Sequence, residues 1–194
     1  MTSHSLEEQD GAVEHAEATP EQLLEMEDGD RFELIDGQLV ERNLGAMSSQ
    51  VALNALGLLR EYVHPKKLGK LFGTDCGYQI FPDKPNQVRY PDGSFIARGR
   101  LSEDRTPGGH VPIPPDLAIE AVSPNDTAEE VETKRLAFLR AGVRLLWVIY
   151  PENRTVHVYR KEGGAAALGE GDELSGEDVL PGFVCKVADL FADL

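Results

Sequence analysis

The stretch that decides the fold is residues 116–160, DLAIEAVSPNDTAEEVETKRLAFLRAGVRLLWVIYPENRTVHVYR. Its first seven residues predict a strand. Residues 143–150 are almost all apolar and β-prone, which is typical of a strand covered on both faces. Between them, residues 126–141 predict a helix that ends at Gly142, because glycine adopts the left-handed conformation found after helix C-termini. This strand–helix–strand order predicts an α/β domain built on a mixed central sheet.

Other segments extend this pattern in both directions. Thr19-Pro20 followed by Gln22 predicts the start of a short helix. Asp36-Gly37 lies between two apolar-bearing runs and predicts a two-residue turn in an N-terminal hairpin over residues 31–42. Three- and four-residue spacing of apolar residues predicts a helix over 47–63. The remaining predicted elements are short strands around 70–72, 77–81, 88–90, 94–97 and 155–160, a loop over 98–115, a Gly/Ala-rich hairpin and a C-terminal helix over 187–194.

Charge is distributed unevenly along the 194 residues, whose formal net charge is −15. Residues 1–30 contain ten acidic residues and no Lys or Arg, and residues 1–18 show no periodicity. We therefore expect an acidic, disordered tail over 1–18 and a single domain over 19–194. The overall charge disfavours long-range attraction to nucleic acid or to anionic membranes. Residues 60–105, with nine basic and six acidic residues, predict a modest basic patch beside the functional site.

Several classes of protein are excluded by missing signals. The sequence has no apolar run near 18 residues and no secretory signal, so we expect no membrane partner. Cys76 and Cys185 are far apart, which excludes a disulfide framework and a CxxC zinc site and favours a cytoplasmic protein. Phosphate-binding loops, dinucleotide-binding glycine motifs, GxSxG and HExxH are absent from the sequence, and the five histidines are scattered.

Glu120 lies in the predicted strand over residues 116–122. Side chains alternate between the faces of a strand, so Glu120 shares its face with Ala118 and Val122. Burying an unpaired carboxylate is costly, so a cation, a metal or water in a cleft must compensate. The alternative is an edge strand whose Glu faces solvent.

A lysine lies on the face of the following helix that should pack on the sheet. Val131, Phe138 and Ala141 form one stripe, and Lys134 is three residues after Val131 on that stripe. One interpretation is that the buried stem carries the ammonium out to solvent. The other is that Lys134 reaches over the sheet toward Glu120.

Asp92 is the third candidate, in the stretch Tyr90-Pro91-Asp92. A Pro-Asp-Gly run alone is typical of a turn. Two carboxylates on adjacent strands together with one lysine, however, form a set of groups suited to Mg²⁺ and a phosphodiester. Mg²⁺ binds through one or two carboxylates plus substrate phosphates, and a lysine can hold the attacking water or stabilise the transition state.

These residues resemble a known family. FELIDGQLVER at 32–42, VRYPDGSFIA at 88–97, the stretch from Pro115 to residue 160, and LPGFVCKVADLF at 180–191 are similar to the Uma2 (Uma-two) family of restriction endonuclease-like proteins. This family, also known as domain-of-unknown-function family eight-twenty, belongs to the PD-(D/E)XK nuclease superfamily. The resemblance covers roughly residues 19–194. It implies a restriction endonuclease-like mixed central sheet flanked by helices.

The resemblance also implies roles for individual residues. Asp92 matches the aspartate of the Pro-Asp motif and Glu120 the acidic residue of the (D/E)XK tripeptide, so both would be Mg²⁺ (or Mn²⁺) ligands. Val122 occupies the usual lysine position, and Lys134 is the match for a lysine that has migrated to the next helix. Glu33 matches a further acidic position, either in or near the metal site or as an exposed strand carboxylate. Gln50 replaces a histidine that relatives often have.

We therefore expect Mg²⁺-dependent hydrolysis of phosphodiester bonds in DNA, by a cytoplasmic homodimer. Asp92, Glu120, Lys134 and Glu33 are the candidate catalytic residues, and the carbonyl of Ala121 is a further candidate ligand. One alternative is a non-catalytic nuclease-fold protein with a binding or assembly role. Another is a hydrolase of a small phosphorylated metabolite. The net charge predicts that DNA binding is weak and sensitive to salt.

Overall fold

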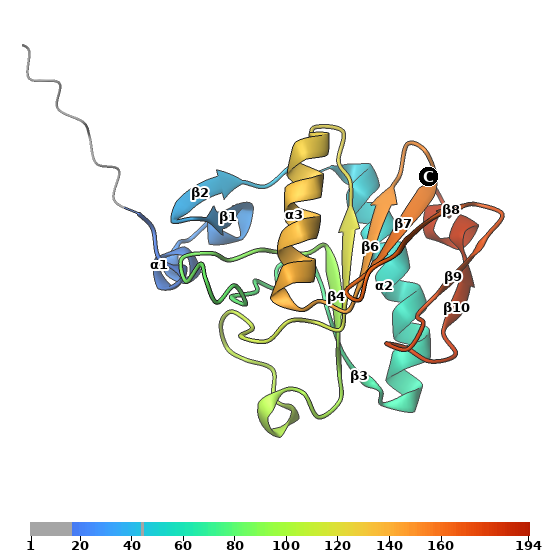
Figure 1. Ribbon diagram of the computed structural model, residues 1–194, viewed down its shortest axis with the longest axis horizontal. Coiled ribbons are helices and arrows are strands. Elements are labelled where there is room, and N and C mark those ends of the chain that lie inside the picture. The colour runs from blue at the N-terminus through green and yellow to red at the C-terminus, as the bar shows by residue number, and fades with distance from the viewer. Residues whose placement is uncertain (1–16, 44) are drawn as a thin grey trace, which may run out of the picture.

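The computed structural model describes residues 17–43 and 45–194, and its centre is a six-stranded sheet between two layers of helices (Figure 1). The strand order is β3-β4-β5-β6-β7-β8; β5 and β6 run parallel, and the other neighbours run antiparallel. The predicted mixed sheet is confirmed. Its strands are β3 (Gly69–Phe72), β4 (Gly93–Ala97), β5 (Leu117–Ala121), β6 (Leu145–Tyr150), β7 (Thr155–Arg160) and β8 (Ala165–Gly169).

The two faces of the sheet are covered by different helices. Leu117, Ile119 and Ala121 of β5 point into a core that α2 and η3 complete. Ala118 points to the opposite face, where it shares a core with Phe138 of α3. The predicted alternation along β5 is therefore confirmed. The helices are α1 (Pro20–Glu25), α2 (Ala46–Lys66) and α3 (Ala128–Ala141), with the 3-10 turns η1 (Gly29–Arg31), η2 (Ser102–Asp104) and η3 (Val187–Phe191).

The N-terminal hairpin consists of β1 (Phe32–Ile35) and β2 (Gln38–Glu41) and lies beside the sheet (Figure 1). Asp36 and Gly37 both have positive φ angles, 50° and 80°, as a tight hairpin turn with matching twist requires. Backbone hydrogen bonds of 2.9 and 3.0 Å between Leu34 and Val88 tie β1 to the segment that leads into β4. This bridge brings the hairpin next to the sheet.

Residues 77–81 and 88–90 are not the regular strands that the sequence predicts. They form isolated bridges, in which Tyr78 pairs with Arg89 and with Val111. Pro82, Pro85 and Pro91 interrupt this region. Proline lacks the N–H group that a continuing ladder needs, so each pairing ends after one bridge.

The C-terminal segment also differs from prediction. The α-helix expected over 187–194 is the shorter 3-10 turn η3, which follows a small hairpin of β9 (Glu173–Ser175) and β10 (Val184–Lys186). A five-residue segment is too short for much α-helical hydrogen bonding. Burial of Leu190 and Phe191 in the α2 side of the core holds the turn in place.

The acidic tail predicted over residues 1–18 lies mostly outside the residues that the structure describes, the first of which is residue 17. Ala18 already donates its N–H to the Gly37 carbonyl at 2.8 Å, so contacts with the hairpin begin just before Thr19. Thr19 and Gln22 form the predicted capping box of α1. None of the helices in residues 17–43 and 45–194 has the length and apolarity needed to cross a membrane.

Candidate active site

Glu120 lies near the carboxyl end of β5, on the face of the sheet that α3 covers. β5 pairs with β4 on one side and β6 on the other, so the alternative of an edge strand is wrong. Only 13% of the Glu120 side chain is exposed. Its neighbours on this face, Ala118 and Val122, belong to an apolar cluster. The carboxylate therefore needs compensation from another element.

α3 supplies a cation because its sheet-facing stripe contains a lysine. Thr127 caps the helix with its side-chain oxygen, and Val131 and Phe138 pack toward the sheet. Lys134 lies between them on the same stripe, and 20% of its side chain is exposed. The ammonium turns toward Glu120, so the interpretation in which it reaches out to solvent is wrong.

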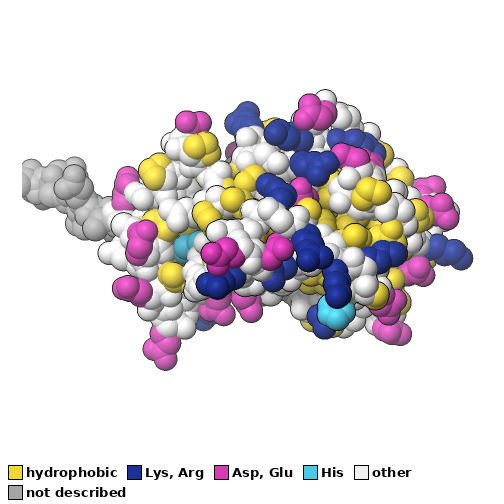
Figure 2. Space-filling view, turned by 90° about the horizontal axis from the view of Figure 1, so that it is seen from below, with side chains coloured by type: hydrophobic (Ala, Val, Ile, Leu, Met, Phe, Trp, Pro, Cys, Tyr) yellow, Lys and Arg dark blue, Asp and Glu magenta, His cyan; other side chains and the backbone are white. Residues whose placement is uncertain are grey.

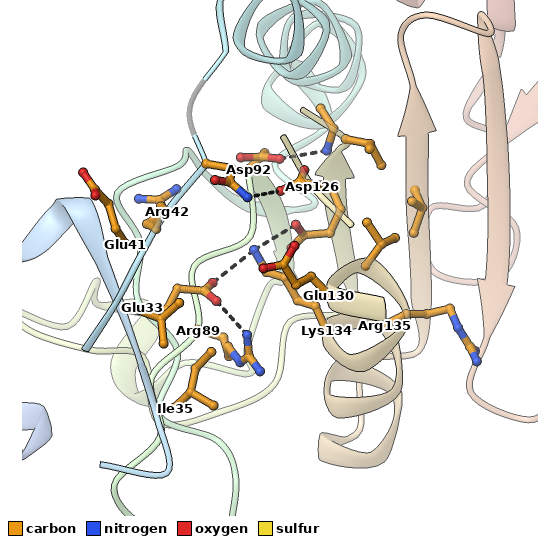
Figure 3. Close-up of a pocket in the computed structure, with 17 residues that line it drawn as sticks. Glu33, Ile35, Glu41, Arg42, Arg89, Asp92, Asp126, Glu130, Lys134 and Arg135 are labelled. Carbon is orange, nitrogen blue, oxygen red and sulfur yellow. Dashed lines mark hydrogen bonds and ion pairs between the residues drawn. The ribbon is translucent and has the colours of Figure 1, made fainter. Parts of the chain in front are cut away.

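The Lys134 ammonium makes three polar contacts, and Figure 3 shows the one with Glu33. Its Nζ lies 2.9 Å from Glu120 Oε2 and 3.0 Å from Glu33 Oε1, and it donates to the Tyr90 carbonyl at 2.9 Å. Burial alone would lower the pKa of Lys134, but the nearby carboxylates, Glu120 foremost, hold that pKa above its usual range. The ammonium is thus held by two ion pairs and one hydrogen bond.

Glu33 comes from β1 and is 6% exposed, so the alternative of an exposed strand carboxylate is wrong. Arg89 Nη1 donates to Glu33 Oε2 at 2.8 Å, and the Tyr90 N–H donates to Glu33 Oε1 at 2.9 Å. Burial would raise the pKa of Glu33, but the charges of Lys134 and Arg89 together with the Tyr90 N–H bond hold it below its usual value. Glu33 is therefore an ionised anchor for Lys134.

Asp92 enters the site at the start of β4. Its N–H donates to the Ile119 carbonyl at 2.9 Å, which fixes it beside β5. Its Oδ2 accepts the N–H of Ala121, the residue after Glu120, at 2.7 Å. Burial raises the pKa of Asp92, while Lys134 and the Ala121 N–H bond act in the opposite direction. Asp92 and Glu120 are thus held on adjacent strands at one end of the sheet.

Glu120 is the least satisfied group of the site. Its Oε1 is buried and accepts no hydrogen bond from any residue that the structure describes. Burial raises the pKa of Glu120 to about 8; Lys134 opposes this shift, and the charges of Asp92 and Glu33 add to it. One ammonium therefore faces several carboxylates.

These groups line one pocket of about 110 Å³ between β2, β5 and α3 (Figure 3). Asp92, Glu120 and Lys134 all contribute to its wall. Asn43 and Asp126 lie at the same pocket, and Asn43 Nδ2 donates to Asp126 Oδ1 at 2.9 Å. This bond links the end of the hairpin to the turn before α3. The pocket therefore collects groups from four separate parts of the chain.

Comparison with protein families gives a match over almost the whole domain. The sequence pattern of the family Uma2, described as "Putative restriction endonuclease", matches residues 20–188. The chain belongs to the Uma2 family. The resemblance drawn from residues 32–42, 88–97, 115–160 and 180–191 is confirmed.

A solved structure shares the fold of this Uma2 protein. The crystal structure of a "putative nuclease belonging to DUF820" from Anabaena variabilis ATCC 29413 superposes with a TM-score of 0.74 at 21% sequence identity. The match covers 89% of this chain and 97% of that chain. At this identity the likeness shows a common fold. No curated protein matches the chain.

The oxygen donors of the Uma2 site suit a magnesium or manganese ion that takes part of its ligands from water or substrate. They do not suit a metal centre whose ligands all come from the protein. Among residues 17–43 and 45–194, no group of three or more His, Cys, Asp or Glu side chains could hold a metal. Asp92 and Glu120 offer two carboxylates, and the buried Glu120 Oε1 lacks a partner within the described chain. Mg²⁺ commonly uses one or two carboxylates and takes its other ligands from water and substrate phosphate.

Some residues of the Uma2 site were not predicted from the sequence. Arg89, Asn43 and Asp126 each contact the site through non-local pairing. A signal for Arg89 existed, because it precedes Tyr90-Pro91-Asp92 in the stretch that carries the resemblance. Gln50, in contrast, donates to Asn54 along α2 and does not line the pocket that contains Glu120.

Arg89 lines the pocket, but most of the basic patch predicted beside the site lies elsewhere. His64, Lys67 and Lys70 line a hollow at the C-terminal end of α2, whereas Asp92 lies near its N-terminal end. α2 has 21 residues, which corresponds to a length of about 30 Å. Most of these cations are close to Asp92 in the sequence but far from it in the structure. They lie at the ends of α2 and β4 that point away from the site.

Proposed function

We propose that this protein is a metal-dependent nuclease that hydrolyses phosphodiester bonds in DNA. One observation carries most of the weight: Glu120 Oε1 is buried without a hydrogen-bond partner among residues 17–43 and 45–194, in a pocket that Glu120 shares with Asp92 and Lys134. A fold selected for stability alone would pair or replace such a group. Family membership supports the same reading.

Asp92 and Glu120 would hold Mg²⁺ or Mn²⁺, with the carbonyl of Ala121 as a further candidate ligand. The ion would lower the pKa of an attacking water and neutralise charge on the scissile phosphate. The N–H bond from Ala121 fixes the Asp92 carboxylate in one orientation, so its donor atom is ordered before the ion arrives. Such preorganisation lowers the cost of assembling the site.

Lys134 would position the water or stabilise the negative charge that develops on phosphate oxygens. It forms ion pairs with Glu120 and Glu33 and donates a hydrogen bond to the Tyr90 carbonyl. A donor becomes available for water or phosphate when the Glu120 carboxylate turns away from it. Glu33 keeps the ammonium in place during this exchange, because Arg89 and the Tyr90 N–H hold Glu33 itself. Glu33 is therefore a positioning residue for Lys134.

The experiment is metal-dependent nicking of supercoiled plasmid DNA by wild type, Asp92→Asn and Glu120→Gln. We expect cleavage in Mg²⁺ or Mn²⁺ by wild type and a loss of about 100- to 1000-fold in each variant, the range for removing a group that stabilises a transition state. Glu130→Gln is the matched control, because Glu130 lines the same pocket but caps α3, a role that Gln also fills.

Two outcomes would contradict the nuclease. Equal cleavage by wild type and both variants would show that a contaminating nuclease, and not this protein, cuts the DNA. Absence of cleavage in wild type, with folded protein and several DNA forms, would favour a non-catalytic binding or assembly role for this fold.

Hydrolysis of a small phosphorylated metabolite is the other alternative. A titration of DNA affinity against salt separates it from the nuclease, because affinity that depends on phosphate contacts falls steeply as salt rises. The homodimer and the cytoplasmic location stay predictions. Size-exclusion chromatography with light scattering checks the dimer.

A further inference from the structure

A series of hollows leads from Asp92 along α2 and β3 to the other end of the molecule. The N-terminal half of α2 and Gly73 line the first hollow, with Asp92 on its wall. Gly73 also lines the second, which shares Phe72 and Thr106 with a third. Lys70 is common to the third and the last. We name this series of neighbouring hollows the α2–β3 groove.

Cations gather at the far end of the α2–β3 groove. Figure 2 views the molecule from that end and shows Lys and Arg side chains in a band across it. No carboxylate in the described part of the chain forms an ion pair with Arg60, Lys67 or Lys70. Asp104, 3.7 Å from Arg98, is the carboxylate that lines this end. The basic side chains that line the last two hollows are Arg60, His64, Lys67, Lys70 and Arg98.

The groove has an apolar wall at the end next to Asp92, and Asp75 lines its second hollow. Leu53 and Leu56 line the hollow next to Asp92, and 62% of Leu53 is exposed. An exposed apolar wall that leads from a carboxylate pair to a set of unpaired cations suits a ligand with an apolar surface and regularly spaced negative charges. The sugar–phosphate backbone of a DNA strand has both properties.

We propose that the α2–β3 groove binds the DNA strand on one side of the scissile phosphate, with its backbone held at the far end by Arg60, Lys67 and Lys70. This inference rests on the proposed nuclease function and adds where the substrate lies. The length of α2, about 30 Å, corresponds to about nine base pairs of duplex at 3.4 Å each. A shorter flank cannot reach the cations.

The test compares Lys67→Gln/Lys70→Gln with wild type in fluorescence anisotropy titrations of labelled DNA, without divalent metal so that no cleavage occurs. Lys161→Gln/Lys186→Gln is the matched control, because it makes the same change in charge near the opposite edge of the sheet. The probes are a duplex of about 30 base pairs, a single strand of the same length, and a duplex of about 6 base pairs.

We expect Lys67→Gln/Lys70→Gln to weaken binding of at least one long probe by about 10-fold and to lower its log–log salt slope by about 2. Binding of all three probes by the control should be unchanged. Whichever long probe loses more identifies the flank as duplex or single-stranded. Equal salt slopes of binding for the variant and wild type on both long probes would overturn the proposal that the α2–β3 groove binds DNA. This readout is independent of cleavage: an inactive wild type with the expected slopes would contradict the nuclease alone.

Discussion

The strand β5 has a buried carboxylate at each end, and the two are treated differently by the fold. Asp116, just before the strand, is 1% exposed and accepts the Ala97 N–H at 2.8 Å. Arg100 and Arg144 both pair with it, at 2.8 and 3.2 Å. The charges of Asp116, Arg100 and Arg144 therefore compensate one another.

The other end of β5 has more negative charge than its cations compensate. Lys134 is shared between Glu120 and Glu33, and the charge of Asp92 lies nearby. Glu120 Oε1 accepts no hydrogen bond within the described chain. The difference shows how one strand serves both stability and function. The fully paired carboxylate of Asp116 stabilises the sheet, and the incompletely paired carboxylate of Glu120 can bind a cation.

Loss of the shared cation should have the largest effect. Lys134→Met removes the partner of Glu120 and Glu33, and we expect DNA cleavage to fall by about 100- to 1000-fold. The measurement is the initial rate of plasmid nicking at saturating Mg²⁺. Lys161→Met, a lysine in the turn between β7 and β8, is the control and should cleave at the wild-type rate. A Lys134→Met protein that is folded and fully active would exclude the lysine from catalysis.

Loss of the paired carboxylate of Asp116 should lower stability without changing the pocket that contains Glu120. Asp116→Ala leaves two arginines and the Ala97 N–H without their acceptor, and we expect the free energy of unfolding to fall by about 3 kcal/mol. Urea denaturation measures this loss. Under conditions where the variant is folded, its cleavage rate should match wild type. A variant as stable as wild type would show that the two ends of β5 do not differ as described.

The smallest effect concerns the pH dependence of stability in metal-free protein. The pKa of Glu120 is about 8 in the folded protein, against an ordinary value of 4.5. A carboxyl with a raised folded pKa stabilises the fold at low pH, and this contribution is lost as pH rises through about 8. Glutamine does not titrate, so the stability of Glu120→Gln does not fall with pH for this reason.

We therefore expect the stability of Glu120→Gln relative to that of wild type to increase from about pH 5 to about pH 8.5. Urea denaturation in the presence of a chelator, at both pH values, gives the comparison. Glu130→Gln is again the control and should follow wild type. A gain that is the same at both pH values would show that Glu120 does not titrate in this range.

Local sequence patterns were sufficient to predict part of the site. Two-residue alternation places Glu120 on an apolar strand face, and helical spacing places Lys134 on an apolar stripe. Each residue breaks a regular pattern, and each therefore stands out in the sequence. Asp92 broke no pattern, because Pro-Asp-Gly is also a common turn; it stood out only as a partner for Glu120 and Lys134 and through the family resemblance.

Non-local contacts were beyond local patterns. The bridge between Leu34 and Val88 brings β1 to the segment before β4 and thereby places Arg89 against Glu33. Nothing within either segment specifies this pairing, so the partners of Glu33 were not predicted. The same limit explains the basic patch: its residues are near Asp92 in sequence, but α2 and β4 carry them to the opposite end of the sheet.

The most direct test of the central claim, that Asp92 and Glu120 hold a catalytic metal, is a Mn²⁺ soak of protein crystals at about pH 8, followed by anomalous diffraction. We predict one strong anomalous peak at bonding distance from carboxylate oxygens of both residues, with Mn–O separations of about 2.2 Å. The same soak of Glu120→Gln should give no peak there. A wild-type crystal that takes up Mn²⁺ at other positions and leaves these two carboxylates without it would contradict the claim.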